Sequence, residues 1–404
     1  MSSVVQPQGA APPVEPIRVM VVDDSVFVRG IVSNWLGEDP EFLVVATHAN
    51  GRRATDDIER AQPDVVILDL EMPEMDGLTA LPLILARRPN TMVVVASTLT
   101  RRGAEVSLKA LTLGAADYLP KPDAGRGIAA ADEFKRDLIS KVRSLGQKAH
   151  RRLGKARPAA TPVPSAVAAP AIIKSASAGI APAAPAAHAP GAAGAGKSRM
   201  PEKMRPYSMA PISVLAVGSS TGGPQALTRV FTEIGPYLGS IPVVIAQHMP
   251  VTFTAILAEH VARASGRPAA EGVEGEVIQP GRIYVAAGGK HMLVEKSNGQ
   301  NVIRVSDAPP VNFCKPAVDP LFGAVAQTYG RGTLALVLTG MGSDGAKGAG
   351  LILDAGGSVI AQDEETSVVW GMPGATVALG NVCDVLPIDG ISRKVVRLLT
   401  GGRA

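Results

Sequence analysis

The residues with the clearest chemical potential lie in a glycine-rich turn. Val214 to Gly223 reads V-L-A-V-G-S-S-T-G-G, so an apolar, strand-like run leads directly into a turn. Ser220 lies in this turn within the pattern G-x-S-x-G, between Gly218 and Gly222. Such a turn bends too sharply for bulky side chains and exposes the hydroxyl beyond the sheet edge, where it can act as a nucleophile. The alternative is a turn that only caps the next helix.

A nucleophilic serine needs a base, and the six histidines differ in their surroundings. His248 follows the apolar run I-P-V-V-I-A-Q, so it emerges at a strand end, as Ser220 does. The carboxyl ends of parallel strands share one sheet edge, so His248 is predicted to reach Ser220 and serve as the base. His291 precedes an apolar run and is predicted to begin a strand. The others lie in the N-terminal part, in or beside a linker, or in a helical stretch: His48, His150, His188 and His260.

An acid that orients the histidine is expected at a third strand end. The strand-like run from Leu334 to Thr339 opens into G-M-G-S-D-G, so Asp344 is predicted to fix the imidazole tautomer. The backbone N–H of Met341 in the same turn is a candidate oxyanion donor. A turn and helix cap is the alternative reading of this segment. The rival acids follow no clear buried strand with a glycine-rich turn: Asp307, Asp319, Asp354 and Asp363.

A second set of reactive groups lies in the N-terminal part of the chain. Asp23 and Asp24 close the first apolar run, and Asp69 closes the third. Carboxylates at one sheet edge repel each other, and Mg²⁺ suits an all-oxygen site that also accepts a phosphoryl group. Ser97 follows the fourth run and Lys121 the fifth, and both can bind phosphoryl oxygens on a modified Asp69. Each acid taken alone could instead cap a helix.

The elements that position these groups alternate along the chain. In the first part the predicted strands are 17–22, 42–47, 65–69, 92–96 and 116–119, with helical spacing at 26–36 and 78–88 between them. After a long Ala/Pro-rich segment the same alternation returns, with strands V-L-A-V-G, V-V-I-A-Q, R-I-Y-V-A, L-A-L-V-L-T and S-V-I-A-Q. The fold class is therefore predicted as α/β. We expect an N-terminal doubly wound (βα)5 domain and a C-terminal α/β doubly wound parallel-sheet domain.

Length and composition divide the 404 residues into two domains. We predict a disordered tail at 1–16, a first domain at 17–146, an Ala/Pro-rich basic linker at 147–208 and a second domain at 209–404. Between 147 and 206, ten Lys and Arg face one acid. The net charge of +4 therefore becomes −5 outside this segment, which argues against binding of nucleic acid by the folded parts.

Targeting signals and cysteine spacing point to the cytoplasm. The N-terminus lacks the pattern of a secretory signal, and no apolar run is long enough to span a membrane, so direct membrane insertion is not expected. Cys314 and Cys383 lack metal-ligand spacing. They are expected as reduced thiols, although one disulfide is the alternative.

The N-terminal pattern resembles the receiver domain of bacterial response regulators. The match covers roughly 17–146 and includes the segment L-D-L-E-M-P-E-M-D-G. The resemblance implies Asp69 as the phosphoacceptor, with Asp23, Asp24 and the backbone carbonyl of Glu71 holding Mg²⁺. It also implies Ser97 and Tyr118 as the switch pair.

With this domain attached, the C-terminal motifs G-S-S-T-G-G, Q-H-M-P and T-G-M-G-S-D-G resemble the chemotaxis protein-glutamate methylesterase/glutaminase family. The order Ser220, His248, Asp344 differs from the Ser…Asp…His order of α/β-hydrolases. The resemblance implies these three residues as nucleophile, base and orienting acid, with Thr221 supporting the histidine and no cofactor in this site. The linker is several times longer than in enteric-type members.

This resemblance also implies substrates and partners. The expected substrates are γ-methyl esters of glutamates, and some glutamines, on the cytoplasmic helices of chemoreceptors. A chemotaxis histidine kinase is the expected phosphodonor, and phosphorylation is expected to uncover the active site. The alternatives are a DNA-binding response regulator, which the acidic C-terminal domain disfavours, and a catalytically silent adaptor that docks through the receiver.

Overall fold

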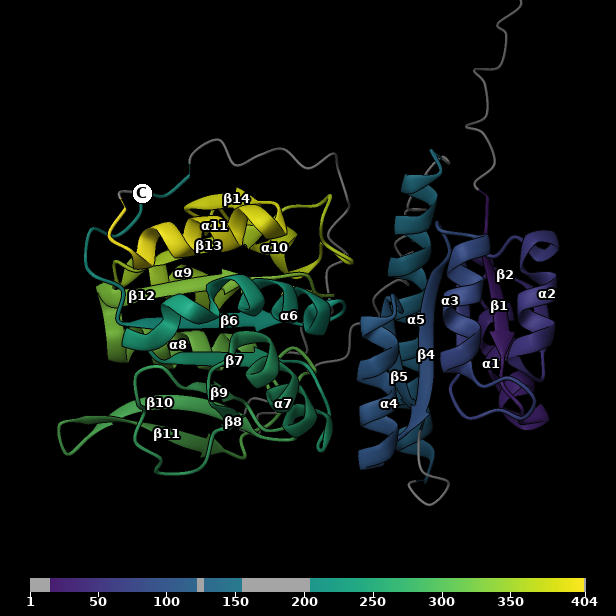
Figure 1. Cartoon of the computed structure of the whole chain (residues 1–404), viewed down its shortest axis with the longest axis horizontal. Coiled ribbons are helices and arrows are strands. Elements are labelled where there is room, and N and C mark those ends of the chain that lie inside the picture. Colours follow the sequence, from purple (N-terminus) through teal and green to yellow (C-terminus); the bar gives the residue numbers. More distant parts are fainter. Residues whose placement is uncertain (1–14, 122–126, 155–203, 403–404) are drawn as a thin grey trace, which may run out of the picture.

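The computed structural model describes residues 15–121, 127–154 and 204–402, which form two α/β domains side by side (Figure 1). The N-terminal sheet has the order β2-β1-β3-β4-β5, and every neighbouring pair is parallel. Its strands are β1 (Ile17–Val22), β2 (Phe42–His48), β3 (Val65–Asp69), β4 (Met92–Thr98) and β5 (Asp117–Lys121). The five expected strands are present, and β5 extends far enough to include Lys121.

Helices cover both faces of this sheet. They are α1 (Val26–Gly37), α2 (Gly51–Ala61), α3 (Gly77–Arg87), α4 (Arg101–Thr112) and α5 (Gly127–Arg152). The core on one face includes side chains of α2, α3 and α4, and the core on the other includes those of α1 and α5. Polar side chains that accept a backbone N–H fix the helix starts, including Asn50 at α2, Asp76 at α3 and Thr100 at α4. The predicted doubly wound (βα)5 fold is confirmed.

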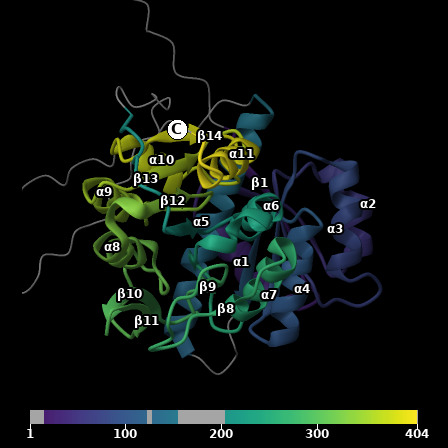
Figure 2. The same ribbon diagram turned by 60° about the vertical axis from the view of Figure 1, so that its left-hand side comes forward.

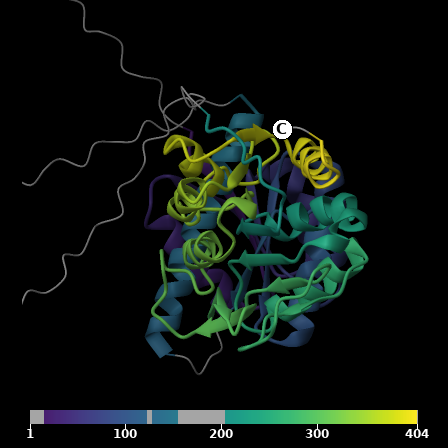
Figure 3. The ribbon, with the colours of Figure 1, turned by 90° about the vertical axis from the view of Figure 1, so that its left-hand side faces the viewer.

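The C-terminal domain contains a seven-stranded parallel sheet of order β14-β13-β12-β6-β7-β9-β8. Its strands are β6 (Val214–Ser219), β7 (Val243–Gln247), β8 (Ala269–Glu271), β9 (Ile283–Val285), β12 (Thr333–Val337), β13 (Ser358–Gln362) and β14 (Asp384–Leu386). The α-helices are α6 (Gly223–Ile234), α7 (Phe253–Ser265), α8 (Val318–Tyr329), α9 (Ala346–Asp354), α10 (Met372–Ala378) and α11 (Ile388–Leu399). Figure 3 shows the strands between α8 and α9 on the left and α6 and α11 on the right. This arrangement confirms the predicted parallel-sheet fold.

An antiparallel hairpin, which the pattern did not lead us to expect, extends this domain. It consists of β10 (His291–Ser297) and β11 (Gln300–Ser306) and forms a separate two-stranded sheet. Asn298 and Gly299 make the turn with φ values of 51° and 79°. An Asn-Gly pair adopts such left-handed conformations readily, so it was the available sequence signal for the hairpin.

The predicted boundary between the first domain and the linker is wrong. Helix α5 continues through 146 to Arg152, so Lys148 and Arg151 belong to folded structure. The Lys148 ammonium donates to the backbone carbonyls of Glu365, at 3.1 Å, and Ser367 in the other domain. The sequence pattern placed these basic residues in the linker because their partners are distant in sequence. The expected disorder of most of the tail (1–14) and most of the linker (155–203) falls outside the described residues.

The two domains contact each other through α4 and β5, which face α6 and α7, and through α5, which contacts loops of the C-terminal domain (Figures 1 and 2). The Tyr118 ring of β5 stacks on Phe253 of α7, with centroids 4.8 Å apart. Gln225 of α6 donates to the Ala115 carbonyl at 2.6 Å, and Arg101 of α4 pairs with Glu259 at 2.9 Å. The N-terminal domain therefore packs against the edge of the C-terminal sheet at which β6 and β7 end.

Candidate active site

The three residues predicted to do chemistry in the C-terminal domain follow three adjacent strands. Strand β6 lies between β12 and β7, and both pairings are parallel. Ser220 directly follows β6, His248 directly follows β7, and Asp344 lies in the turn after β12. Because parallel strands bring their carboxyl ends to one edge, the strand order alone places these side chains together.

Glycines allow the turns at this edge to approach closely. Gly222 has φ of 75°, a left-handed conformation that favours glycine. A Cβ on Gly223 would lie 2.0 Å from the Gln247 side-chain oxygen, and a Cβ on Gly340 would lie 2.9 Å from the Cβ of Ser220. The Ser220 amide donates to the Thr339 carbonyl at 3.0 Å, which ties the serine turn to the turn after β12. The pattern predicted a sharp glycine-dependent turn at Ser220, and the structure has one.

Asp344 is buried and held by four donors. The His248 Nε2 lies 2.7 Å from Asp344 Oδ2. The amides of Val318 and Asp319, at the start of α8, and the Asn312 side chain also donate to this carboxylate, at 2.5, 3.1 and 3.0 Å. Burial alone would raise the pKa of Asp344, but the hydrogen bonds from His248 and the helix amides lower it. Asp344 therefore remains ionised beside the imidazole.

The imidazole of His248 is held at both nitrogens. Asp344 contacts Nε2, and the Cys314 sulfur lies 3.3 Å from Nδ1. Burial alone would lower the pKa of His248, but hydrogen bonds to Asp344 and Cys314 raise it to about 10. Among the hydrogen bonds of the described residues, none joins Ser220 to His248. Sequence reasoning missed Cys314 because the segment V-N-F-C-K-P has no motif that marks a thiol near a histidine.

The two predicted supporting residues also contact the N-terminal domain. The Thr221 hydroxyl donates to Asp117 of β5 at 2.8 Å, so in this arrangement it is engaged away from His248. The Met341 sulfur accepts from Ser140 of α5 at 2.9 Å. Domain closure explains both contacts, because β5 and α5 lie over the turns that carry Thr221 and Met341. The roles assigned to these residues in catalysis stay predictions.

Three of the four remaining described histidines have structural partners, and the fourth, His260, lies in α7 as the helical pattern predicted. His291 begins β10 as expected and is buried, with Pro309 and Ala317 backbone groups on its two nitrogens. His150 is buried at the end of α5 and lies 2.9 Å from Asp64. His48 pairs with Asp57 at 3.0 Å. His188 falls outside the described residues.

A second polar site lies at the carboxyl edge of the N-terminal sheet. Carboxylate oxygens of Asp23, Asp24 and Asp69 lie within 4.8 Å of one another. The Lys121 ammonium bridges Asp23 and Asp69 at 2.7 and 2.8 Å. Burial raises the pKa of Asp69 to about 6, assisted by the charge of Asp23 and opposed by Lys121. An oxygen-only cluster whose negative charge one ammonium does not balance fits a hard divalent cation such as Mg²⁺.

The other groups predicted around Asp69 lie nearby on neighbouring segments. The Glu71 amide donates to Asp69 Oδ1 at 3.3 Å, which places the Glu71 backbone beside the cluster. The Ser97 hydroxyl is buried and lies 2.5 Å from that of Ser107. Tyr118 is buried against Phe253 of the other domain. The aromatic residue predicted to switch is therefore part of the domain interface.

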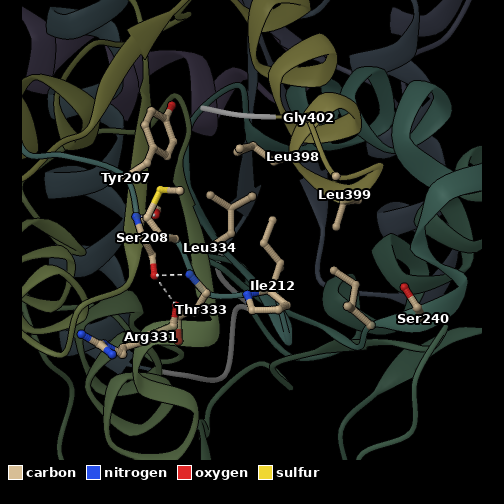
Figure 4. A pocket seen from close by; sticks show the side chains of 16 residues that line it. Tyr207, Ser208, Ile212, Ser240, Arg331, Thr333, Leu334, Leu398, Leu399 and Gly402 are labelled. Carbon is tan, nitrogen blue, oxygen red and sulfur yellow. Dashed lines mark hydrogen bonds between the residues drawn. The ribbon is translucent and has the colours of Figure 1, made fainter.

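A pocket of about 450 Å³ lies away from both sites (Figure 4). Its lining includes Thr333 and Ser358, which begin β12 and β13, so it is at the amino end of the sheet. The nucleophile, base and acid candidates all lie at the opposite edge. Within the described residues, no helix combines the length and apolar character needed to cross a membrane.

Comparisons with known proteins agree with both halves of this description. The CheB methylesterase family matches residues 215–395, and the response regulator receiver domain family matches residues 19–132. A protein-glutamate methylesterase/protein-glutamine glutaminase of group 2 operon from Rhodopseudomonas palustris is 53% identical over 390 residues, covering 96% of each chain. One from Bradyrhizobium diazoefficiens is 51% identical, with 96% of each chain covered. The crystal structure of the Thermotoga maritima CheB methylesterase catalytic domain is 37% identical, with a TM-score of 0.45, and covers 47% of this chain and all of that one. The chain belongs to the protein-glutamate methylesterase/protein-glutamine glutaminase family.

Proposed function

We propose that this chain is a phosphorylation-activated serine hydrolase that removes γ-methyl esters from glutamates on chemoreceptor cytoplasmic helices and deamidates some glutamines there. This activity provides adaptation in bacterial chemotaxis. The observation that carries the proposal is the His248–Asp344 contact of 2.7 Å at the same sheet edge as Ser220. Family membership supports the substrate class, because glutamyl esters and amides both react by acyl transfer to a serine.

In the proposed reaction Ser220 is the nucleophile, His248 the base and Asp344 the acid that orients the histidine. The Ser220 Oγ attacks the ester carbonyl carbon while His248 accepts its proton at Nδ1, since Asp344 holds the proton on Nε2. The Met341 amide donates to the oxyanion. Methanol, or ammonia from glutamine, leaves with the proton from His248. Water then loses a proton to His248 and hydrolyses the acyl-enzyme, which releases glutamate and restores Ser220.

The proposed switch is phosphorylation of Asp69 by a chemotaxis histidine kinase. Asp23, Asp24, Asp69 and the Glu71 carbonyl would hold Mg²⁺, which neutralises charge on the phosphoryl group. Ser97 and Lys121 would bind the phosphoryl oxygens, because a hydroxyl and an ammonium are suitable donors. When Ser97 and Lys121 bind the phosphoryl group, they leave the hydrogen bond and ion pairs that they make in this structure. The population then shifts toward an arrangement of the domains in which the Tyr118 and Phe253 rings separate.

The closed domain arrangement supports such regulation. Thr221, which follows the candidate nucleophile, lies under β5, and Met341, the candidate oxyanion donor, lies under α5, as the Thr221–Asp117 and Met341–Ser140 contacts indicate. A receptor helix needs access to this same edge of the sheet. The receptors, the kinase and the chain are proposed to meet in the cytoplasm.

Methanol release from methylated receptor, with and without a small acyl phosphate as phosphodonor, tests this function. We expect release that increases with the phosphodonor and disappears in Ser220→Ala. Methanol release retained by Ser220→Ala would refute the assignment of the nucleophile. Absence of release from the unmodified chain under both conditions would favour a catalytically silent adaptor.

A further inference from the structure

A short loop of the C-terminal domain connects the candidate catalytic residues to the receiver domain. Val311 and Cys314 form a β-bridge, and the two residues between them have positive φ values, 52° at Asn312 and 63° at Phe313. A left-handed conformation is tolerated by asparagine but is costly for Phe313, and it persists where surrounding contacts impose it. The contacts made by this loop should therefore account for its shape.

Each of three consecutive loop residues has a different partner. The Asn312 side chain donates to Asp344 at 3.0 Å and to Asp319 at 3.2 Å. Phe313 is 71% exposed, and the guanidinium of Arg136 on α5 lies over its ring, 5.0 Å from the ring centroid. The Cys314 sulfur lies 3.3 Å from His248 Nδ1. The loop thus touches the orienting acid, the receiver domain and the base at once.

Nδ1 is the nitrogen that the reaction needs. Because Asp344 occupies Nε2, the proton of Ser220 must transfer to Nδ1. A thiol that donates to Nδ1 uses the same lone pair, and a thiolate paired with a protonated imidazole removes it. In either state of the thiol, the base is unavailable to Ser220 while the Cys314 contact is made.

We infer that Cys314 is a positioning residue that competes with Ser220 for Nδ1 of His248, and that the Arg136–Phe313 contact favours Cys314 while the domains are closed. The inference rests on the proposed serine hydrolase function. It adds a second level of inhibition to the covering of the site, because the closed receiver domain also holds the base in an unproductive contact. Separation of the domains removes Arg136 from the loop and frees Nδ1.

The charged groups around His248 define what a change at Cys314 should do. Asp344 and Cys314 face the imidazole directly, and Asp319 lies one step further away through Asn312. Loss of the Cys314 contact leaves Asp344 as the direct partner. The imidazole should then lose its proton at a lower pH, and the acid limb of the reactivity of Ser220 should move to lower pH.

The test measures how fast an alkyl fluorophosphonate labels Ser220 in the full-length, unphosphorylated chain across neutral and alkaline pH. This small probe reports activation of the serine without any receptor. For Cys314→Ala we expect labelling about fivefold faster near neutral pH, the effect of one ordinary hydrogen bond, and an acid limb displaced to lower pH. Phe313→Ala and Arg136→Ala should change both readouts in the same direction and less strongly. Cys383→Ser and Arg102→Ala serve as matched controls, because Cys383 contacts the Pro206 carbonyl and Arg102 is exposed on α4.

The outcomes separate this inference from the proposed function. Wild-type rate and pH profile in Cys314→Ala would overturn the inference, even if the unmodified chain releases methanol from receptor. Cys314→Val, which keeps a side chain of similar size but has no hydrogen-bond donor, guards against misfolding of the alanine variant and should displace the acid limb in the same direction. Failure of the unmodified chain to release methanol, with labelling still sensitive to Cys314, would refute the function and leave the competition for Nδ1 supported.

Discussion

Asp69 and Asp344 are both buried carboxylates at the carboxyl edge of a parallel sheet, yet burial has opposite outcomes for them. Asp344 accepts hydrogen bonds from two amides at the start of α8, from Asn312 and from His248, and its pKa is lowered. Asp69 shares one ammonium with a second carboxylate, and its pKa rises to about 6. Hydrogen bonds therefore compensate the charge of Asp344 in this structure, whereas the charge of Asp69 is not compensated.

This difference matches the tasks proposed for the two sites. A catalytic site works best when its charges are already fixed, because no reorganisation is then needed during reaction. A switch needs a site whose balance changes when a ligand or a phosphoryl group arrives. In this chain the site around Asp69, whose charge is not compensated, belongs to the domain that covers the site around Asp344.

Ser220→Ala should give the largest effect. Loss of the nucleophile is expected to reduce methanol release by about 10⁴-fold or more. Ser219→Ala is the matched control, since the buried Ser219 hydroxyl donates to the Gln247 side chain at 2.6 Å and not to the proposed reaction centre. A comparable loss in both variants would show that the turn, rather than the Ser220 hydroxyl, is what the reaction requires.

Asp344→Asn should reduce turnover by about 10³- to 10⁴-fold with little change in substrate binding. The amide can no longer fix the proton on Nε2 of His248 or stabilise the imidazolium. Steady-state kinetics on phosphorylated enzyme would show the loss in kcat rather than KM. A variant with near-normal kcat would mean that the compensated carboxylate does not orient the base.

Asp69→Asn should stabilise the folded chain at neutral pH. In the folded state Asp69 keeps its proton up to a pH of about 6, above its ordinary value of 3.8. The folded state then binds the proton more tightly than the unfolded one. The free energy of unfolding should therefore fall as pH rises through this interval, by about 3 kcal/mol. Urea denaturation at both ends of the interval should show that the wild type loses about 3 kcal/mol of this free energy relative to the variant, and that Mg²⁺ reduces this difference. An identical pH dependence in the variant would show that ionisation of Asp69 does not destabilise the folded chain.

Gln225→Ala tests the interface that joins the two sites. Loss of its 2.6 Å hydrogen bond to the Ala115 carbonyl should shift the closed population toward the open one. We expect basal methanol release to rise about fivefold without phosphodonor, while release with phosphodonor is unchanged. Gln300→Ala, at the exposed tip of the β10–β11 hairpin, is the control. An unchanged basal rate would argue that this contact does not hold the domains closed.

Arg101→Ala should have the smallest effect. Its contacts with Glu259 and Glu105 are exposed to solvent, and such pairs contribute little. Basal release is expected to rise about twofold at low ionic strength and not at high ionic strength, where the pair is already screened. Arg102→Ala provides a comparison on the same helix. A large effect that persists in salt would contradict a purely electrostatic contact.

The sequence predicted where the candidate catalytic residues lie because one rule of parallel sheets decides their placement. Residues that follow β6, β7 and β12 meet at one edge, and local apolar runs marked all three strand ends. The same rule brought Asp23, Asp69 and Lys121 together. Local patterns and strand order therefore sufficed to bring these residues together at the two sheet edges.

Features that depend on distant partners could not be predicted in this way. Lys148 and Arg151 lie in α5 and contact the other domain, where Lys148 donates to a backbone carbonyl and Arg151 pairs with Glu364. Thr221 contacts Asp117, and Cys314 contacts His248, through domain and loop packing that no local pattern encodes. The regulation proposed for this chain lies mainly in these long-range contacts.

Control of the esterase by Asp69 is tested by the ratio of methanol release with phosphodonor to release without it, measured for the wild type and Asp69→Asn. If the receiver acid controls access to a site that is already assembled, the wild type should show a ratio of about ten or more, and Asp69→Asn a ratio of one. Full activation of Asp69→Asn by phosphodonor would contradict the account.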